Sequence, residues 1–141
     1  MALPPLLKLS STVAYRNHFR KHYVGTGPVI TFDGIEVRFF PHNFDHTFFT
    51  ESVRGSRIKD KFDGERARRM DWIAAVLRAR TAELYRRVMA NGKLRRIALV
   101  SAERYAVIIA VDKNVRRANF VTAYVVNSDS ALSKMRSNPK W

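Results

Sequence analysis

The sequence predicts an α+β fold in which helices pack on one face of a small antiparallel β-sheet. A capped helix is expected over residues 11–23, and apolar residues recur at helical spacing from Glu65 onward. Three short β-rich runs then follow between residues 95 and 126, and their compact polar connections are typical of an antiparallel meander. A last helix is expected from Asp129 to about Arg136.

The N-terminal region begins with two prolines, so we expect an extended lead-in or linker over residues 1–10. Ser10 or Ser11 is a suitable N-cap for the helix over residues 11–23, and the glycines that follow end it. A chain of 141 residues with 46% apolar residues fits one compact core. Residues 11–141 are therefore expected to form a single domain.

Residues 29–40, "VITFDGIEVRFF", alternate between apolar and polar positions on either side of Asp33-Gly34. This pattern predicts a β-hairpin with a two-residue turn. Residues 41–64 are polar and aromatic without clean periodicity, which leaves a short helix or a long loop open. Functional residues often lie in such segments.

A long helix is expected to begin at Glu65, because apolar residues recur at helical spacing as far as Val88. Thr81 is a candidate break in this helix. Residues 105–111 are apolar on both faces, which favours a central place in the sheet. The residues at helical spacing are Met70, Ile73, Leu77, Leu84 and Val88.

The last β-rich run, residues 119–126, presents two different faces because strand side chains alternate. The small aliphatic face suits packing beneath helices, and the hydroxyl-bearing face is expected to be open. Thr and Tyr also favour strands without any special role. The aliphatic set is Val121, Ala123 and Val125, and the opposite set is Phe120, Thr122, Tyr124 and Val126.

The charge of the chain points to a polyanionic partner. Twenty-six Lys and Arg against twelve Asp and Glu give a formal net charge of +14. Nucleic acid is the first candidate partner and an acidic protein is the second. No apolar run approaches the roughly 20 residues of a membrane-spanning helix. The absence of cysteine excludes disulfides and thiolate zinc sites and suits a reducing cytoplasm.

Four histidines form two pairs at a spacing of four, His18 with His22 and His42 with His46. Such pairs can bind zinc, but "HFRKH" lacks the glutamate of the HExxH motif. Asp45 is a candidate third ligand for the second pair. We expect no metal site, because catalytic metal nucleases usually rely on several carboxylates and this chain has few. His18 and His22 are expected to lie on the surface of a helix.

Two interpretations of His46 stay open. The ring either packs among the neighbouring phenylalanines or acts as a general acid or base, since imidazole changes charge near neutral pH. Arg66 poses a similar choice. It lies seven residues before Ile73 and eleven before Leu77, so it points along the apolar stripe of its helix. A charge placed there must be paired, must reach past the sheet to solvent, or must serve a site.

The order of four motifs carries a resemblance to a known family. "FxxHxFDHxFF", "KDxFxxxRAxRxxWI", "FVTAY" and a terminal "SxPxW" follow one another along the chain. In this order the sequence resembles the phage-associated branch of the barnase–EndoU–colicin–RelE nuclease superfamily, over about residues 29–141. The resemblance implies a barnase- or RelE-like fold, with a curved antiparallel sheet whose open face carries the active site. It also implies a toxin that cuts RNA without a metal or other cofactor.

The resemblance assigns roles to individual residues. The ribose 2′-hydroxyl of RNA is the nucleophile, so the protein supplies a base, an acid for the leaving 5′-oxygen and cations for the phosphorane. His46 matches the family's histidine and is expected to transfer protons. Lys59 or Lys61 and Arg66 match its basic positions, and Thr122 matches a hydroxyl residue that hydrogen-bonds a phosphate oxygen.

Further residues are candidates around this set. Tyr124 is expected to hydrogen-bond a phosphate or stack on a base. Glu51 is expected to orient His46 or to act as the base, and Asp60 competes for that role. Guanidinium groups bind phosphates well. The arginines expected to contact RNA are Arg57, Arg69, Arg104 and Arg117.

The implied partners are RNA, whether transfer, messenger or ribosomal, and an acidic antitoxin or immunity protein. The site of action is expected to be the cytoplasm, either of the cell that makes the protein or of a cell that receives it. Two alternatives stay open. One is a non-catalytic RNA- or DNA-binding protein. The other is a phage factor that binds an acidic host protein, whose association the net charge would accelerate.

Overall fold

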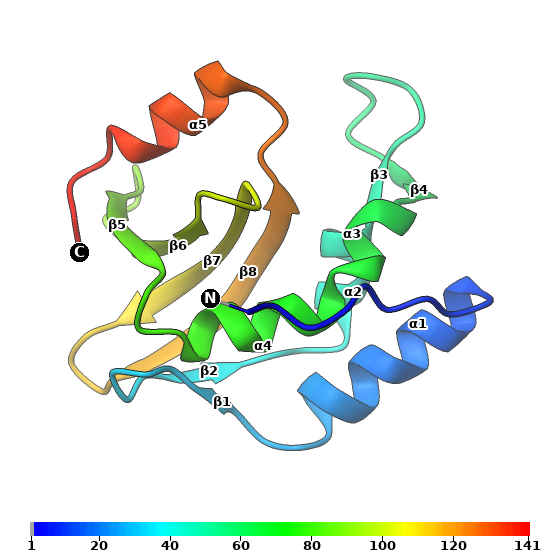
Figure 1. The fold of residues 1–141 in the computed structure, drawn as a ribbon, viewed down its shortest axis with the longest axis horizontal. Helices are drawn as coiled ribbons and strands as arrows, with labels where there is room; N and C mark the ends of the chain where they lie inside the picture. Colours follow the sequence, from blue (N-terminus) through cyan, green and yellow to red (C-terminus); the bar gives the residue numbers. More distant parts are fainter. Residues whose placement is uncertain (1) are drawn as a thin grey trace.

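The structure, a computed structural model, describes residues 2–141 and is shown in Figure 1. Within this range no helix has the length and apolar character needed to cross a membrane. In chain order the elements are α1 (Thr12–Phe19), the π-helical turn η1 (Arg20–Val24), β1 (Val29–Ile30), β2 (Glu36–Arg38), α2 (His42–Phe48), β3 (Phe49–Glu51), β4 (Lys59–Phe62), α3 (Gly64–Arg68), α4 (Met70–Arg78), β5 (Glu83–Val88), β6 (Leu94–Val100), β7 (Tyr105–Asp112), β8 (Arg117–Val125) and α5 (Asp129–Arg136).

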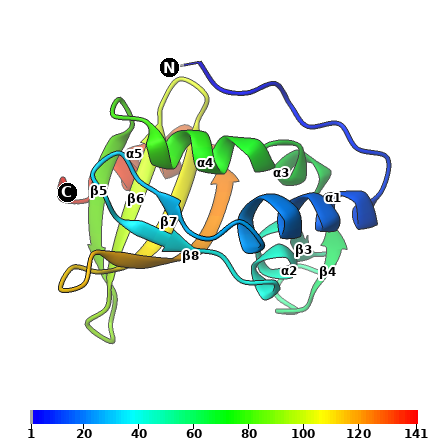
Figure 2. The ribbon, with the colours of Figure 1, turned by 90° about the horizontal axis from the view of Figure 1, so that it is seen from below.

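Six strands form one sheet in the order β1-β2-β8-β7-β6-β5, and β3 pairs with β4 in a separate hairpin. Neighbouring strands of the sheet are antiparallel except β2 and β8, which are parallel and lie side by side in Figure 2. The expected α+β class is confirmed, and the sheet is mostly antiparallel, with this one parallel pair as the exception. The central place expected for residues 105–111 is also confirmed, because β7 lies between β8 and β6.

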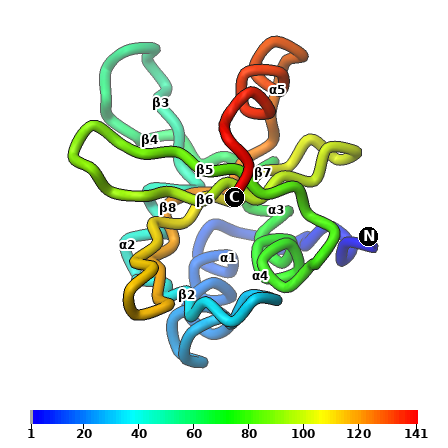
Figure 3. The backbone as a smooth tube through the Cα atoms, turned by 90° about the vertical axis from the view of Figure 1, so that its left-hand side faces the viewer, coloured from blue at the N-terminus to red at the C-terminus, as the bar shows by residue number. Residues whose placement is uncertain are grey.

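Helices cover both faces of the sheet, which differs from the expectation that all of them share one face. Figure 3 shows α1 and α4 on one side of the sheet and α5 on the other. Leu132 and Met135 of α5 pack on Ile97 and Ile108, which belong to the face opposite α1 and α4. The apolar spacing of a helix predicts that the helix packs on the sheet, but it does not show which face of the sheet the helix covers.

Most local predictions are confirmed. Ser11 caps α1, and its Oγ accepts a hydrogen bond from the backbone N of Ala14 at 3.1 Å. α5 has the predicted bounds, and the three β-rich runs become β6, β7 and β8. β1 and β2 form the expected hairpin, but its connection spans residues 31–35 instead of two residues. Gly34 adopts a φ of 87° in this turn, which favours glycine.

The long helix expected from Glu65 toward Val88 is wrong in its second half. α3 and α4 form it only as far as Arg78, and residues 83–88 become the strand β5. Leu84 and Val88 are four residues apart, a spacing that places two side chains on the same face of a helix and equally of a strand. Thr81 does lie in the connection between α4 and β5, as the candidate break predicted.

A β-bulge in β8 changes the faces predicted for two residues. The pairing of β7 with β8 shifts between Ile108 and Ile109 and leaves Val121 as the extra residue. Phe120 therefore packs in the core beneath α1 and α4, and Val121 packs on the α5 side. Both placements are the reverse of the expectation, because one inserted residue exchanges the faces of a strand. The alternation predicted for residues 122–126 is kept.

The lead-in is packed against the body of the protein. Figure 1 shows it running beside α4 and α3 before the chain enters α1. The backbone N of Leu7 donates to the carbonyl of Arg68, and Nε1 of Trp72 donates to the carbonyl of Pro4, each at 2.7 Å. Its leucines also pack against the main core. The segment thus adds contacts to the helical layer.

An ion pair between a buried arginine and a partly exposed aspartate connects the hairpin turn with β6. Arg96 is 2% exposed, and its Nη1 donates to Oδ1 and Oδ2 of Asp33 at 3.0 and 2.9 Å. The rings of Phe32 and Trp141 cover the guanidinium, with centroids 5.4 and 5.2 Å away. Burial opposes ionisation of Asp33, but hydrogen bonds from Thr31 and Arg96 outweigh it and lower the pKa of the carboxyl.

We predict that Asp33→Ala lowers the free energy of unfolding by roughly 3 kcal/mol, because Arg96 would stay charged and buried without its partner. Asp45→Ala is the matched control, since Asp45 pairs with Arg16 on the surface at 2.8 Å and such pairs contribute less than about 1 kcal/mol. Urea denaturation of both variants measures the difference. Equal losses in the two variants would contradict the importance of burial.

Candidate functional site

His46 lies on the outer side of α2, away from the phenylalanines around it. Phe44 and Phe48 are fully buried in the core, whereas His46 is exposed. Residues four apart share a helix face, and a residue midway between them points to the opposite side. The interpretation of His46 as a packing residue is therefore wrong. Its imidazole forms no hydrogen bond within residues 2–141 and is available to a ligand.

Two cations converge on the end of α2. Nζ of Lys59, in β4, donates to the carbonyl of His46 at 2.8 Å. Nη1 of Arg66, in α3, donates to the carbonyl of Thr47 at 3.2 Å. The last carbonyls of a helix have no partner within it and carry partial negative charge. The geometry at the end of α2 thus brings Lys59 and Arg66 to His46.

This arrangement changes the proton affinity of His46. The partial burial of the imidazole lowers its pKa, and the positive charges of Lys59, Arg66 and Arg95 lower it further. Burial and Arg66 also lower the pKa of Lys59. At neutral pH His46 is accordingly in its neutral form, which can accept a proton. The ammonium of Lys59 releases its proton more readily than that of an ordinary lysine.

Arg66 is both paired and directed at the site. Its Nε lies 3.5 Å from Oδ2 of Asp63, the residue that caps α3. Its guanidinium carbon lies 5.7 Å from the centre of the Tyr124 ring, a cation–π distance. Arg66 therefore connects α2, α3 and β8. Of the alternatives left open by the sequence, the structure shows that Arg66 is paired, and its role in a site stays a prediction.

The face of the sheet opposite α1 and α4 carries the remaining candidates. Thr122 lies opposite Ile108 on this face, and Tyr124 follows two residues later. Arg87 of β5 pairs with Arg95 of β6. This pair lies two residues from the pair Tyr85 and Ile97, so it lies on the same face. Like charges placed opposite each other are unfavourable. Neither arginine has a carboxylate within ion-pair distance among the described residues, so both are available to an anion.

A cavity of about 600 Å³ lies between this face and α5. Arg66 and Tyr124 line it, and the charge of Arg66 also lowers the pKa of His46, so Arg66 connects the cavity with the surroundings of His46. Arg87 and Lys134 add two further cations, and residues of the sheet and of α5 complete the wall. The structure therefore brings together His46, Lys59, Arg66, Tyr124 and the face that carries Thr122.

Other predicted site residues lie elsewhere. In the β3–β4 hairpin, Lys59 opposes Glu51 and Lys61 opposes Thr50. Thr50 and Glu51 are adjacent in β3 and therefore face opposite sides of the hairpin. Their partners Lys61 and Lys59 consequently also lie on opposite faces. Of the two lysines that the sequence left open, the structure places Lys59 beside His46.

Glu51 and Asp60 organise the loop between β3 and β4. The carboxylate of Glu51 accepts hydrogen bonds from the backbone N of Gly55 and Arg57, both at 2.9 Å. Asp60 accepts from the backbone N of Ser52 at 2.9 Å and from its Oγ at 2.7 Å. Neither carboxylate contacts the imidazole of His46. Both are held by the loop, which favours a structural role for them.

The four arginines expected to contact RNA do not form one patch. Arg57 lies in the β3–β4 loop, and Arg69 pairs with Glu65 and lies over the ring of Trp72. Arg104 precedes β7 at one end of the sheet, and Arg117 begins β8 at the other. Arg104 pairs with Asp129 and Arg117 with Glu36, at the surface.

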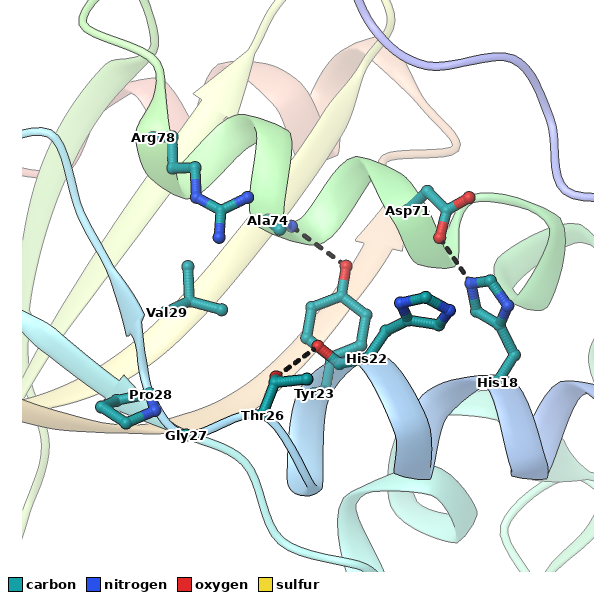
Figure 4. A pocket seen from close by; sticks show the side chains of 10 residues that line it. All are labelled: His18, His22, Tyr23, Thr26, Gly27, Pro28, Val29, Asp71, Ala74 and Arg78. Atoms are coloured by element: carbon teal, nitrogen blue, oxygen red, sulfur yellow. Dashed lines mark hydrogen bonds and ion pairs between the residues drawn. The ribbon is translucent and has the colours of Figure 1, made fainter.

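A second cavity, of about 540 Å³, lies between η1 and α4 (Figure 4). His18 and His22 border it, with ring centres 4.2 Å apart, and Nε2 of His18 lies 2.8 Å from Oδ1 of Asp71. His18 is half-buried rather than a simple surface residue. In residues 2–141 no group of three or more His, Cys, Asp or Glu is placed to hold a metal ion.

Arg87, Arg95 and Lys134 were not singled out in the sequence. Arg95, Ile97 and Leu99 follow one another at a spacing of two, which in a strand places them on the same face and was a usable signal. Arg87 was hidden because residues 83–88 were expected to be helical. Comparison with family models, curated proteins and solved structures finds no match for this chain. The family resemblance therefore stays a prediction.

We predict that the imidazole of His46 titrates below the ordinary histidine pKa of about 6.5. Lys59→Met should raise this pKa, because it removes a nearby positive charge. Lys61→Met should leave it unchanged, since Lys61 lies on the other face of the hairpin. Proton NMR of the imidazole between pH 4 and pH 9 gives all three values. An equal response to both variants would show that net charge alone sets the pKa.

We also predict that Glu51→Ala loosens the β3–β4 loop. The amides of Gly55 and Arg57 lose their acceptor and should exchange with solvent roughly tenfold faster. Amides in the centre of β6 should not change, because that strand is paired on both sides. Hydrogen exchange followed by mass spectrometry measures both. Unchanged exchange in the loop would show that Glu51 does not hold it.

Proposed function

We propose that this protein is a metal-independent endoribonuclease of the toxin type. The observation that supports this function is the position of the His46 imidazole, which is exposed, forms no hydrogen bond within residues 2–141 and lies near the charges of Lys59, Arg66 and Arg95. A neutral imidazole beside several cations is suited to take a proton from a nucleophile next to a phosphate. RNA carries such a nucleophile in its ribose 2′-hydroxyl.

In the proposed reaction His46 accepts the proton of the 2′-hydroxyl as its oxygen attacks phosphorus. The bond from phosphorus to the 5′-oxygen then breaks, which leaves a 2′,3′-cyclic phosphate and a free 5′-hydroxyl. Lys59, whose Nζ lies 2.8 Å from the carbonyl oxygen of His46, gives a proton to the leaving oxygen, and its lowered pKa makes that proton easier to release. Arg66 stabilises the additional negative charge of the phosphorane through two parallel hydrogen bonds. Thr122 contributes a hydrogen bond to a phosphate oxygen.

The cationic face gives the substrate its affinity. Arg87, Arg95 and Lys134 extend the positive charge from Arg66 along the sheet and α5. Contacts of this kind bind a phosphate backbone without regard to sequence and weaken as salt concentration rises. The same face suits an acidic antitoxin or immunity protein, which we propose as the protective partner. The proposed site of action is the cytoplasm, where RNA is abundant.

A second candidate function is non-catalytic binding of RNA or DNA. The opposed pair Arg87 and Arg95 favours it, because unpaired arginines on a sheet bind phosphate whether or not a bond is cut. Only the enzyme requires His46. A binder would lose affinity gradually as its many cations are neutralised, and it would show no strong dependence on one imidazole.

We predict that the purified protein cleaves total bacterial RNA or isolated tRNA in excess EDTA. His46→Ala should slow cleavage by about 10²- to 10⁴-fold, the usual contribution of a general base, while affinity for RNA stays within about twofold. His22→Ala is the matched control, because this exposed histidine lies in the other cavity. Loss of cleavage in EDTA would contradict the metal-independent reaction. Tight, salt-sensitive binding without cleavage would favour the second candidate.

A further inference from the structure

The cavity between the sheet and α5 has an apolar floor. Ile97 and Ile108 of the sheet and Met135 of α5 line it, and each is at least nine-tenths buried. Polar side chains surround this floor instead of covering it. A site with an apolar interior and a few polar groups at its edge is typical of small-ligand binding. The cavity volume of about 600 Å³ lies within the range of such sites.

One wall of the cavity is suited to a flat, aromatic ligand. Tyr124 presents a ring there, and the guanidinium of Arg66 lies 5.7 Å from the ring centre. Aromatic rings and guanidinium planes are the groups on which unstacked bases of RNA stack. Because Arg66 also belongs to the surroundings of His46, a base in this cavity would lie next to a phosphate at the proposed reaction centre.

The rim of the cavity supplies charge and hydrogen bonds. Arg87 and Lys134 are cations without a carboxylate partner in the part of the chain that the structure describes. Asn127 lines the cavity, and within residues 2–141 its side-chain amide forms no hydrogen bond. An amide offers a donor and an acceptor together, the combination that reads the edge of a base. The cations suit the phosphates that flank that base.

We propose that the cavity beneath α5 is a nucleobase-binding subsite. It holds one base of the RNA next to the scissile phosphate and gives cleavage a base preference. This inference rests on the proposed ribonuclease function, which concerns the groups around His46. The base stacks beside Tyr124 above Ile97 and Ile108, and Asn127 contacts its edge.

Calorimetry with the four 3′-nucleoside monophosphates, and with ribose 5-phosphate as a probe without a base, tests this proposal. At least one nucleotide should bind about tenfold more tightly than ribose phosphate, which is a modest value for one stacked base. Ala131→Trp should abolish this difference, because Ala131 lines the cavity from an exposed position on α5. Ser133→Trp should retain it, since Ser133 is exposed on the same helix and does not line the cavity.

The outcomes separate this inference from the proposed function. Thermal denaturation of both tryptophan variants checks that each is folded. Base-dependent binding that Ala131→Trp alone removes supports the subsite, even if the protein cuts no RNA. Equal binding of nucleotides and ribose phosphate overturns the subsite, even if RNA is cleaved. Base-dependent binding that survives in Ala131→Trp also overturns it, because the base would then lie elsewhere.

Discussion

The structure depends on one constraint, which is that both faces of the three strands β6, β7 and β8 are used. One face is covered by α1 and α4 and carries the main core, and the other is covered only in part, by α5. Alternation along each strand therefore separates core residues from residues that can meet a ligand. The bulge at Val121 belongs to this constraint, because it brings Phe120 into the core and leaves Thr122 and Tyr124 on the open face.

The charge distribution follows the same division between the two faces. Arg96 lies on the covered side and needs Asp33, because a buried guanidinium without a partner is costly. Arg87 and Arg95 lie on the partly open side, where solvent reduces their mutual repulsion. The excess positive charge of the chain therefore has different consequences at neighbouring positions of the same strand. Arg96 is neutralised by Asp33 on one face, whereas Arg87 and Arg95 on the other face have no carboxylate partner among the described residues.

The sequence allowed the N-cap of α1, the central strand and the alternation of residues 122–126 in β8 to be predicted, because each depends on local spacing or on a single side chain. β5 was missed because a spacing of four fits both a helix and a strand. The side of the sheet that α5 covers depends on long-range packing, which periodicity does not contain. For the candidate site, the sequence was sufficient to name His46 and Arg66. It could not distinguish Lys59 from Lys61, because the two lie on opposite faces of the hairpin only through the bulge that pairs Glu51 with Lys59. The sequence made Glu51 a candidate for acid–base chemistry, and the structure shows that its carboxylate accepts hydrogen bonds from loop amides.

The cations of the site differ from His46 in what they do for the fold. Lys59 and Arg66 hold the last carbonyls of α2, and Arg66 also contacts Asp63 and Tyr124. Their removal would change the structure around the histidine together with the charge. The imidazole of His46 holds no other part of the described chain in place. Its substitution therefore separates chemistry from folding, and for this reason the function of the protein is best judged at His46 rather than at the more strongly charged residues around it.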